Sequence, residues 1–227
     1  MHFHLPKPVH GWRQLVGEVG IIVVGVLIAL GGEQVVEALH WRHQVEGFRD
    51  VVHREIAADL GSYEYRMKQN ACVKRRLDEL EKWLAGWRAQ EPRTLARPIG
   101  SPSSLSLDTS VWESRDANLV SHMPIAERMI IGRLYDEFAN NEAHRLDERE
   151  TWLQLAEYDG APTLDNRELM RLRGLISRAR FRDNRITSNA TIYLRDAAKI
   201  GVQPKDDSDN RFLEPGFCAS LFSRGAS

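Results

Sequence analysis

An apolar run near the N-terminus is the strongest pattern along the chain. Residues 17–30 read GEVGIIVVGVLIAL, and Glu18 is the only charged residue from Leu15 to Gly32. A helix over residues 15–32 spans about 27 Å, close to the roughly 30 Å of a bilayer's hydrocarbon core. The pattern therefore predicts one membrane-spanning helix over residues 15–32, solvated by the lipid bilayer and preceded by a short tail.

Aromatic and basic residues flank this run on both sides. Trp12 and Arg13 precede it, and Trp41 and Arg42 follow it. In a continuous helix the two tryptophans lie about 43 Å apart along the axis, which matches a bilayer with its headgroup layers. Tryptophan and arginine favour the membrane–water interface, so we expect these four residues to anchor the two ends of the helix.

Small residues mark one face of the predicted membrane helix. Glu18, Ile22, Gly25, Ala29 and Gly32 recur at spacings of three and four. Small side chains let two helix backbones approach closely within a bilayer. The face predicts self-association or contact with another membrane protein, with Glu18 protonated or hydrogen-bonded there. A carboxylate near the headgroups, on a helix rich in glycine for other reasons, explains the same residues.

Two other interpretations fit the apolar run. Lys7 and Arg13 before it, and small residues around Ala29 at its end, fit a cleaved signal peptide. A buried core helix of a soluble protein also contains about ten to fourteen apolar residues in a row. The charge of Glu18 and the helical pattern that continues past Gly32 favour an uncleaved membrane helix.

Helical periodicity continues beyond the apolar run. Residues 33–87 contain no proline, and apolar residues recur there at helical spacing. This segment predicts a long helix that leaves the membrane directly, with candidate kinks at Gly61 and at the polar pair Gln69 and Asn70. Three prolines and many hydroxyl residues in 92–106 predict a loop.

Two more long helices are expected after a short one at 108–118. The first begins near Pro124, because proline suits a first turn, and stops at the glycine and proline that follow Asp159. The second begins at Asp165, whose side chain can cap the helix while Glu168 reaches back, and ends at Gly201.

The predicted fold class is therefore all-α. The N-terminal transmembrane helix continues into an antiparallel bundle of three long helices. The domain boundaries that follow are a tail at 1–14, the membrane helix at 15–32, a helical extramembrane domain at 33–203 and a C-terminal tail at 204–227. We expect the C-terminal tail to lie over the bundle surface.

Charge is divided unevenly between the last two long helices. Residues 113–159 hold 11 acidic and 5 basic side chains, whereas residues 166–200 hold 9 basic and 3 acidic ones. Five arginines are expected along one edge of the last helix: Arg167, Arg171, Arg178, Arg182 and Arg185. We expect them to pair with carboxylates such as Asp136, Glu142 or Asp147. An anionic partner, such as lipid headgroups, is the alternative.

The composition fits a folded protein without a strong overall field. The 227 residues include 31 Lys and Arg against 32 Asp and Glu, for a net charge of -1. No nucleic-acid partner is therefore expected. Cys72 and Cys218 have no zinc-ligand spacing. They predict either a disulfide, if the domain lies outside the cytoplasm, or two buried thiols.

No motif in the chain carries recognisable catalytic or cofactor chemistry. Glu33, Glu37, His40 and Gln44 share a helical face, but a dinuclear carboxylate site needs two Glu-x-x-His pairs, and only Glu37 with His40 fits. The sequence lacks a glycine-rich phosphate loop, a nucleophile elbow and an HExxH motif. We expect no cofactor, no metal and no catalytic residue.

The N-terminal segment PKPVHGWRQLVGEVGIIVVGVLIALGGEQVVEALHWR resembles the start of a group of bacterial single-pass membrane proteins that have no established function. The resemblance covers about the first 45 residues, with a weaker echo around Thr109 to Tyr135. It implies an uncleaved membrane helix and a helical extramembrane domain, and it implies no activity.

These observations favour a non-enzymatic interaction or scaffold protein of the bacterial envelope. The predicted location is the inner membrane, with the N-terminus in the cytoplasm and the large domain in the periplasm. An extracytoplasmic ligand-sensing module that acts through a partner is the second hypothesis, and a hydrolase or metal enzyme with a site between helices is the third.

Overall fold

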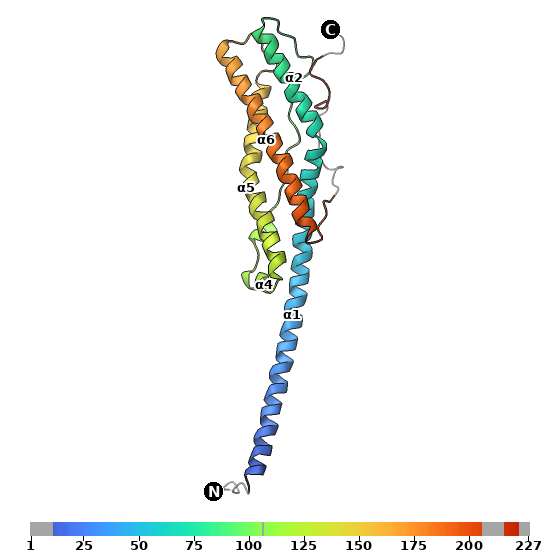
Figure 1. The fold of residues 1–227 in the computed structure, drawn as a ribbon, viewed down its shortest axis with the longest axis vertical. Coiled ribbons are helices and arrows are strands. Elements are labelled where there is room, and N and C mark those ends of the chain that lie inside the picture. Colours follow the sequence, from blue (N-terminus) through green and yellow to red (C-terminus); the bar gives the residue numbers. More distant parts are fainter. Residues whose placement is uncertain (1–10, 106, 206–215, 223–227) are drawn as a thin grey trace, which may run out of the picture.

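The computed structural model describes residues 11–105, 107–205 and 216–222. All regular structure in those ranges is helical, which confirms the predicted all-α class. Four long helices, α1, α2, α5 and α6, form the molecule together with two short ones (Figure 1). The predicted tails fall partly on residues 1–10, 206–215 and 223–227, which lie outside the described ranges.

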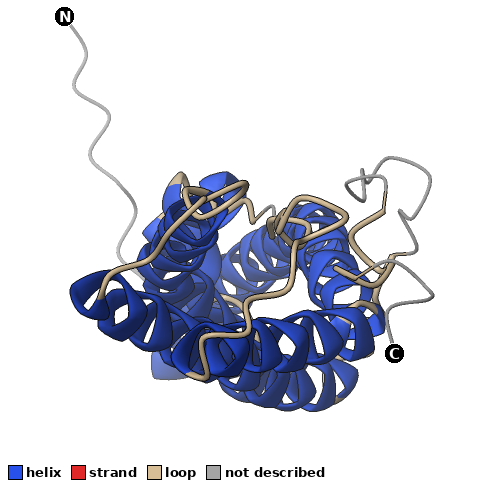
Figure 2. Cartoon of the chain, turned by 90° about the horizontal axis from the view of Figure 1, so that it is seen from above, coloured by secondary structure: helices blue, strands red, loops and turns tan. Residues whose placement is uncertain are grey.

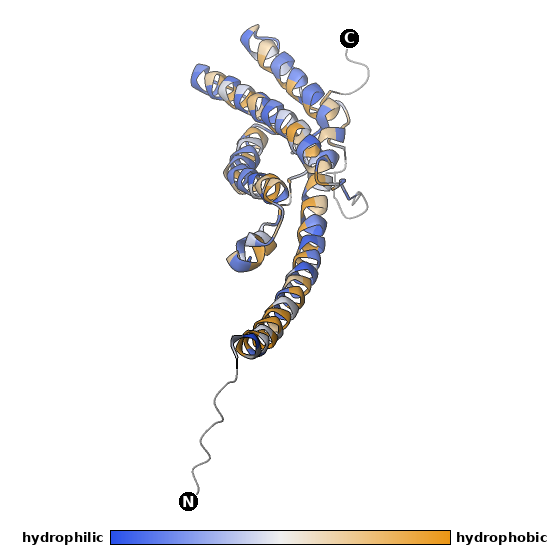
Figure 3. Ribbon diagram, turned by 60° about the horizontal axis from the view of Figure 1, so that its bottom comes forward, coloured by the Kyte–Doolittle hydropathy of each residue, from blue (hydrophilic) through white to orange (hydrophobic). Residues whose placement is uncertain are grey.

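Helix α1 (Trp12–Lys68) is 57 residues long and extends well beyond the bundle. At a rise of about 1.5 Å per residue it measures about 85 Å. It passes the predicted domain boundary at 32/33 without a break and also continues through Gly61, one of the candidate kinks. Figure 3 shows that apolar residues dominate its N-terminal half.

One helix among the described residues is long and apolar enough to cross a membrane, and it is α1. The most apolar 18-residue window has a mean hydropathy of 2.3, and none of its residues is buried. A core helix of a soluble protein would be covered by the rest of the fold. The exposure of this window therefore separates it from a core helix.

Helix α2 (Asn70–Arg88) continues the direction of α1 after a break at Gln69, where the sequence predicts a kink. The backbone N–H of Gln69 bonds to the carbonyl of Arg66, and its side-chain amide bonds to Ser103 in the loop that follows α2. A side chain that fastens the helix to a neighbouring loop explains why the break lies here.

The second half of the chain folds back along the first. Short helices α3 (Ser110–Glu113) and α4 (Ala117–Ser121) replace the single helix expected at 108–118. Helix α5 (Ile125–Ala156) starts after Pro124, as predicted. Helix α6 (Asn166–Ala198) has the predicted capping box of Asp165 and Glu168. Viewed from above, the helices stand side by side, and α6 packs against α5, α2 and α1 (Figure 2).

The bundle has two apolar cores. The lower core, nearer the apolar half of α1, is built from α1, α5 and α6 around residues such as Ile56, Phe138 and Tyr193. The upper core joins α2, α5 and α6 with the segment 216–222. Phe217 and Leu221 of that segment are buried, so this part of the C-terminal tail completes the upper core and is more than a surface covering.

Candidate functional site

The residues predicted to line a membrane-helix interface are exposed in the single chain. A Cβ atom added at Gly25 or Gly32 would meet no atom within 4 Å, because no other described segment lies beside this part of α1. Glu18, Ile22 and Ala29 are exposed as well. Nothing in the described part of the chain therefore covers this face between Glu18 and Gly32.

A pocket of about 620 Å³ opens between α1 and the start of α5, and we call it the stem pocket. Trp41, predicted as an interfacial anchor, lines this pocket and stacks on His122, with ring centroids 4.2 Å apart. Trp12 and Arg13, the anchors expected at the other end, are exposed. The remaining lining residues are Gln34, Glu37, Ala38, Arg42, Val45, Glu46, Arg49 and Pro124.

Two arginines of the stem pocket are held in different ways. Arg49 donates two hydrogen bonds to Glu127, at 2.6 and 2.8 Å, and this bond raises the pKa of its guanidinium. Arg42 pairs with Glu46 at 3.0 Å, but both side chains are at least half exposed. Exposed pairs of this kind contribute about 0–1 kcal/mol, so Arg42 can exchange its partner readily.

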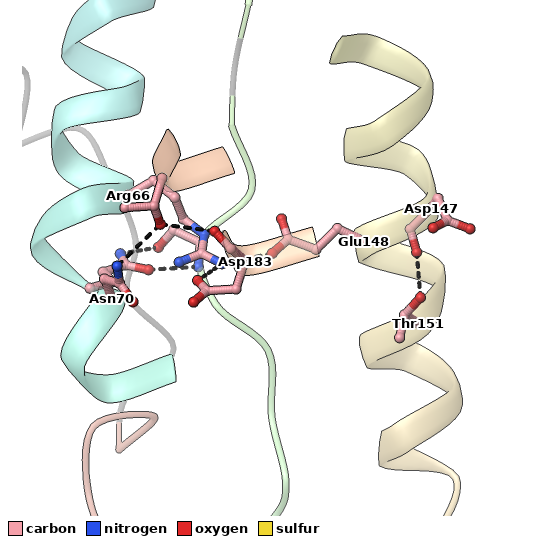
Figure 4. Close-up of polar contacts among 9 residues, drawn as sticks. Arg66, Asn70, Asp147, Glu148, Thr151 and Asp183 are labelled. Atoms are coloured by element: carbon pink, nitrogen blue, oxygen red, sulfur yellow. Dashed lines mark hydrogen bonds and ion pairs between the residues drawn. The ribbon is translucent and has the colours of Figure 1, made fainter. Parts of the chain in front are cut away.

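A layer of buried charge separates the two cores. Arg66 of α1 lies 2.7 Å from Glu148 of α5 and 3.1 Å from Asp183 of α6, and each of the three residues is less than 5% exposed. Figure 4 shows these side chains converging from three helices. Burial raises the pKa of the Asp183 carboxyl, although Arg66 opposes the shift.

A second pocket, of about 320 Å³, opens beside this charged layer, and we call it the waist pocket. Glu148 and Trp152 line it from α5, and the loop Ser101–Ser104 lines it from the other side. Arg145 also lines it and pairs with Glu142 of its own helix. The pocket therefore lies between α5 and the loop, and one of its lining residues, Glu148, is a partner of the buried Arg66.

The structure joins Cys72 of α2 to Cys218 of the C-terminal segment in a disulfide. Buried Arg76, one turn along α2, donates hydrogen bonds to the carbonyls of Pro98, Phe217 and Ala219. One covalent bond and one buried cation therefore hold the C-terminal segment on α2.

The α6 arginines divide into two groups. Arg182 pairs with Asp147 of α5 at 2.6 Å, one of the expected partners, and Arg171 pairs with Glu157 at 3.2 Å. Within the described ranges the other three form no ion pair, and all of them are exposed: Arg167, Arg178 and Arg185. The structure therefore ties part of this arginine edge to α5 and the loop after it, and leaves the rest to solvent.

Sequence reasoning did not single out the buried residues Arg66, Arg76 and Asp183. A signal for them exists, because Arg66 follows Tyr63 by three positions and Asp183 follows Ala179 by four, so both continue the apolar stripes of their helices. A charged residue in register with a core stripe is a candidate for a buried pair.

No metal site emerges from the part of the chain that is described, where no group of three or more His, Cys, Asp and Glu residues is placed to hold an ion. His40, considered with Glu37 as a metal-binding pair, instead lies 2.9 Å from Gln44. Comparison of the chain with family models, curated proteins and solved structures found no match. The resemblance of the N-terminus stays a prediction.

Proposed function

We propose that the protein is a membrane-anchored, non-enzymatic interaction protein, whose helical bundle binds another envelope component or a second copy of itself. The observation that carries the proposal is the continuity of α1, which runs as one helix from its uncovered apolar half into the lower core. Because no flexible linker intervenes, the bundle stands at a fixed height and orientation relative to the membrane.

Exposed apolar side chains on the bundle support an interaction role. Leu146 and Leu153 on α5 and Met170 and Phe181 on α6 are each at least half exposed. Arg167, Arg178 and Arg185 on α6, which form no ion pair with any described residue, accompany the exposed apolar side chains of that helix, so its surface suits a partner with apolar and acidic groups. Surfaces of this composition are common in transient protein interfaces.

We further propose that the bundle lies in the periplasm, with the N-terminus in the cytoplasm and α1 in the inner membrane. The disulfide between Cys72 and Cys218 supports this side, because disulfides persist in oxidising compartments and are rare in the cytosol. A phosphatase fused to the C-terminus should be active, and a fusion that is active only in the cytoplasm should be inactive. The reverse result would place the bundle in the cytoplasm.

The membrane anchor is tested by extraction. We expect the full-length chain to stay in the membrane pellet at alkaline pH in carbonate and to dissolve only in detergent. Its intact mass should include residues 1–32. A shortened mass would indicate a cleaved signal peptide, and release by carbonate would remove the anchor from the proposal.

The interaction role is tested by crosslinking and pull-down. A cysteine at Gly25 should form a dimer by oxidation in the native membrane if the small-residue face mediates self-association. A cysteine at Val24 on a neighbouring face serves as the control and should crosslink less. Pull-down from solubilised membranes should return a second copy or another membrane protein, and recovery of the monomer alone would contradict the proposal.

The waist pocket favours a second function, that of a ligand-sensing module. A ligand in this pocket would contact Glu148, which also binds Arg66 next to the break at Gln69. Ligand binding there can bias the angle between α1 and α2, and a partner would have to carry the signal onward. A screen of small solutes for a rise in melting temperature tests this, with Arg149→Glu, which alters the pocket lining, as the insensitive variant.

A further inference from the structure

We propose that the stem pocket binds the headgroup of a zwitterionic phospholipid with a primary ammonium group, a phosphoethanolamine lipid of the bilayer that α1 crosses. The inference rests on the proposed membrane anchoring and names one ligand for it. Its elements are the position of the pocket, the pattern of its charges and the exposed apolar side chains around it.

The position of the pocket brings it to headgroup level. If Trp12 and Trp41 mark the two interfaces, as their separation of about 43 Å suggests, Trp41 lies among the headgroups. Trp41 is itself a wall of the pocket, and Gln34 extends the lining toward the apolar half of α1. The pocket therefore lies at the level where phosphate and ammonium groups are concentrated.

The charges of the pocket match a headgroup that carries both signs. Arg42 and Arg49 line it together with Glu37 and Glu46, so the lining has two cations and two anions. Arg49 is engaged with Glu127, whereas Arg42, among the residues that the structure describes, forms an ion pair with exposed Glu46 alone. The phosphate can pair with Arg42 while the ammonium pairs with Glu46. One weak ion pair within the protein is then replaced by two ion pairs with the lipid.

The same charges oppose an anionic headgroup. A glycerol phosphate headgroup can bind Arg42, but it has no cation for Glu37 or Glu46, and those carboxylates would then lie beside a negative charge. Like charges at close range are destabilising. The pocket should therefore prefer phosphatidylethanolamine to phosphatidylglycerol.

Apolar side chains beside the pocket are exposed in the protein alone. Ile125 and Met129, in the first turns of α5, are 65% and 69% exposed, and they follow Pro124, which lines the pocket. On the stem, Val35 and Leu39 are each 60% exposed. The glycerol backbone and upper acyl chains of a bound lipid would cover these apolar side chains, and their removal from water is favourable.

The test measures lipids that stay bound to the purified full-length protein. Protein in detergent would be mixed with phosphatidylethanolamine, with phosphatidylglycerol of the same acyl chains, or with inorganic phosphate, and bound molecules counted by native mass spectrometry. Arg42→Glu is the test variant, and Arg54→Glu, exposed on α1 outside the pocket, is its matched control. Carbonate extraction of each variant reports separately on membrane anchoring.

We expect one phosphatidylethanolamine to be retained about fivefold better than phosphatidylglycerol, the ratio that one exposed charge pair of about 1 kcal/mol provides. Arg42→Glu should weaken retention of phosphatidylethanolamine about fivefold, because the phosphate loses its cation, whereas Arg54→Glu should leave retention unchanged. Glu46→Arg should reverse the preference toward phosphatidylglycerol, because the ammonium then loses its carboxylate. Equal retention of both lipids, or retention unchanged in Arg42→Glu, overturns the proposal while extraction still supports the anchor. Displacement of the lipid by inorganic phosphate would overturn it too, because it would identify a free-phosphate site.

Discussion

Trp41 of α1 and His122, which ends α4, stack with their ring centroids 4.2 Å apart and their planes inclined by 13°. The contact joins residues 81 positions apart and closes the lower end of the bundle on the stem of α1. Below it, α1 has no described neighbour. The stack is therefore the last packing contact between the bundle and the apolar half of α1. Its loss should destabilise the lower end of the bundle first.

Trp41→Ala should loosen the lower end of the bundle. An aromatic stack is worth about 0.5–1.5 kcal/mol beyond its buried area, so we expect a fall in melting temperature of about 1–6 °C. Near-ultraviolet circular dichroism of the full chain in detergent measures it. Trp12→Ala, which changes an exposed tryptophan at the far end of α1, should leave the melting temperature unchanged. Equal effects of the two variants would show that the stack contributes nothing.

Gly61 should tolerate no side chain, although it lies inside a helix. A Cβ atom there would overlap the backbone carbonyl of Lys205. Backbone atoms cannot move aside as the end of a flexible side chain can. The segment after α6 is fastened at this point, since Lys205 donates its N–H to the carbonyl of Ala57 at 2.8 Å. Gly61→Ala should destabilise the bundle by about 1–3 kcal/mol.

Gly47 on the same helix is the matched control for Gly61. A Cβ atom at Gly47 meets nothing within 4 Å. Alanine there gains helix propensity, so Gly47→Ala should stabilise by about 0.5–1 kcal/mol. Chemical denaturation of both variants gives the two signs, and stabilisation by Gly61→Ala would show that the segment near Lys205 does not pack on α1.

The features that were predictable from sequence are those with local signals. Asp165 and Glu168 cap α6 through contacts three residues apart, and Pro124 sets the start of α5 through its own backbone. The arginines are different. Only the pairing of the Arg182 side chain with Asp147 agrees with the expected partners, because helix rotation and height decide which charges meet. Sequence periodicity predicts neither the rotation of a helix against its neighbour nor its height along it.

The sites of the bundle depend on contacts between distant positions. Arg66 reaches Glu148 across 82 residues, and Trp41 stacks on His122, a contact that no sequence pattern predicts. The stem pocket exists only because α4 and α5 return to the stem at that height. Such placement follows from how three helices pack, which a single-sequence pattern does not specify.

The disulfide should contribute strongly to stability. It closes a loop of 146 residues, and in the chain-entropy model a loop of that length is worth about 5 kcal/mol. Replacing both Cys72 and Cys218 by serine should therefore lower the unfolding free energy by up to this amount. Ser220→Ala, which removes the hydrogen bonds of one hydroxyl in the same segment, to Glu79 and from the N–H of Phe222, should cost about 1–2 kcal/mol. Two titratable thiols in protein isolated without reductant would contradict the bond.

Arg66 should be the most sensitive polar residue of the bundle. Its removal leaves Glu148 and Asp183 buried without their cation, and breaking a buried pair in this way costs about 3–5 kcal/mol. Arg66→Met should show this loss in chemical denaturation. Adding Glu148→Gln and Asp183→Asn to it should recover much of the stability, because none of these three positions then buries a charge. A triple variant as unstable as Arg66→Met would show that shape, and not charge, is decisive at this layer.

Asp183 should also give the bundle a distinctive dependence on pH. Burial raises the pKa of its carboxyl, so the folded protein holds a proton at pH values where the unfolded chain has released it. The contribution of this group is therefore greatest in acid and falls as the pH rises from about 4 through the raised pKa. Asp183→Asn removes that loss, so the stability of the variant relative to the natural protein should increase with pH across this window.

Asp196 on the same helix provides the opposite case. The hydrogen bond from Lys199 lowers the pKa of its carboxyl, so its stabilising contribution is present above the unfolded pKa and is lost in acid. Asp196→Asn should therefore destabilise the bundle near neutral pH, and the deficit should shrink as the pH falls. Denaturation curves for both variants at several pH values measure the two slopes. The stability of each variant relative to the natural protein should change with pH in opposite directions. A change in the same direction would contradict the raised pKa of Asp183, because only a carboxyl that burial keeps protonated destabilises the folded protein when it ionises.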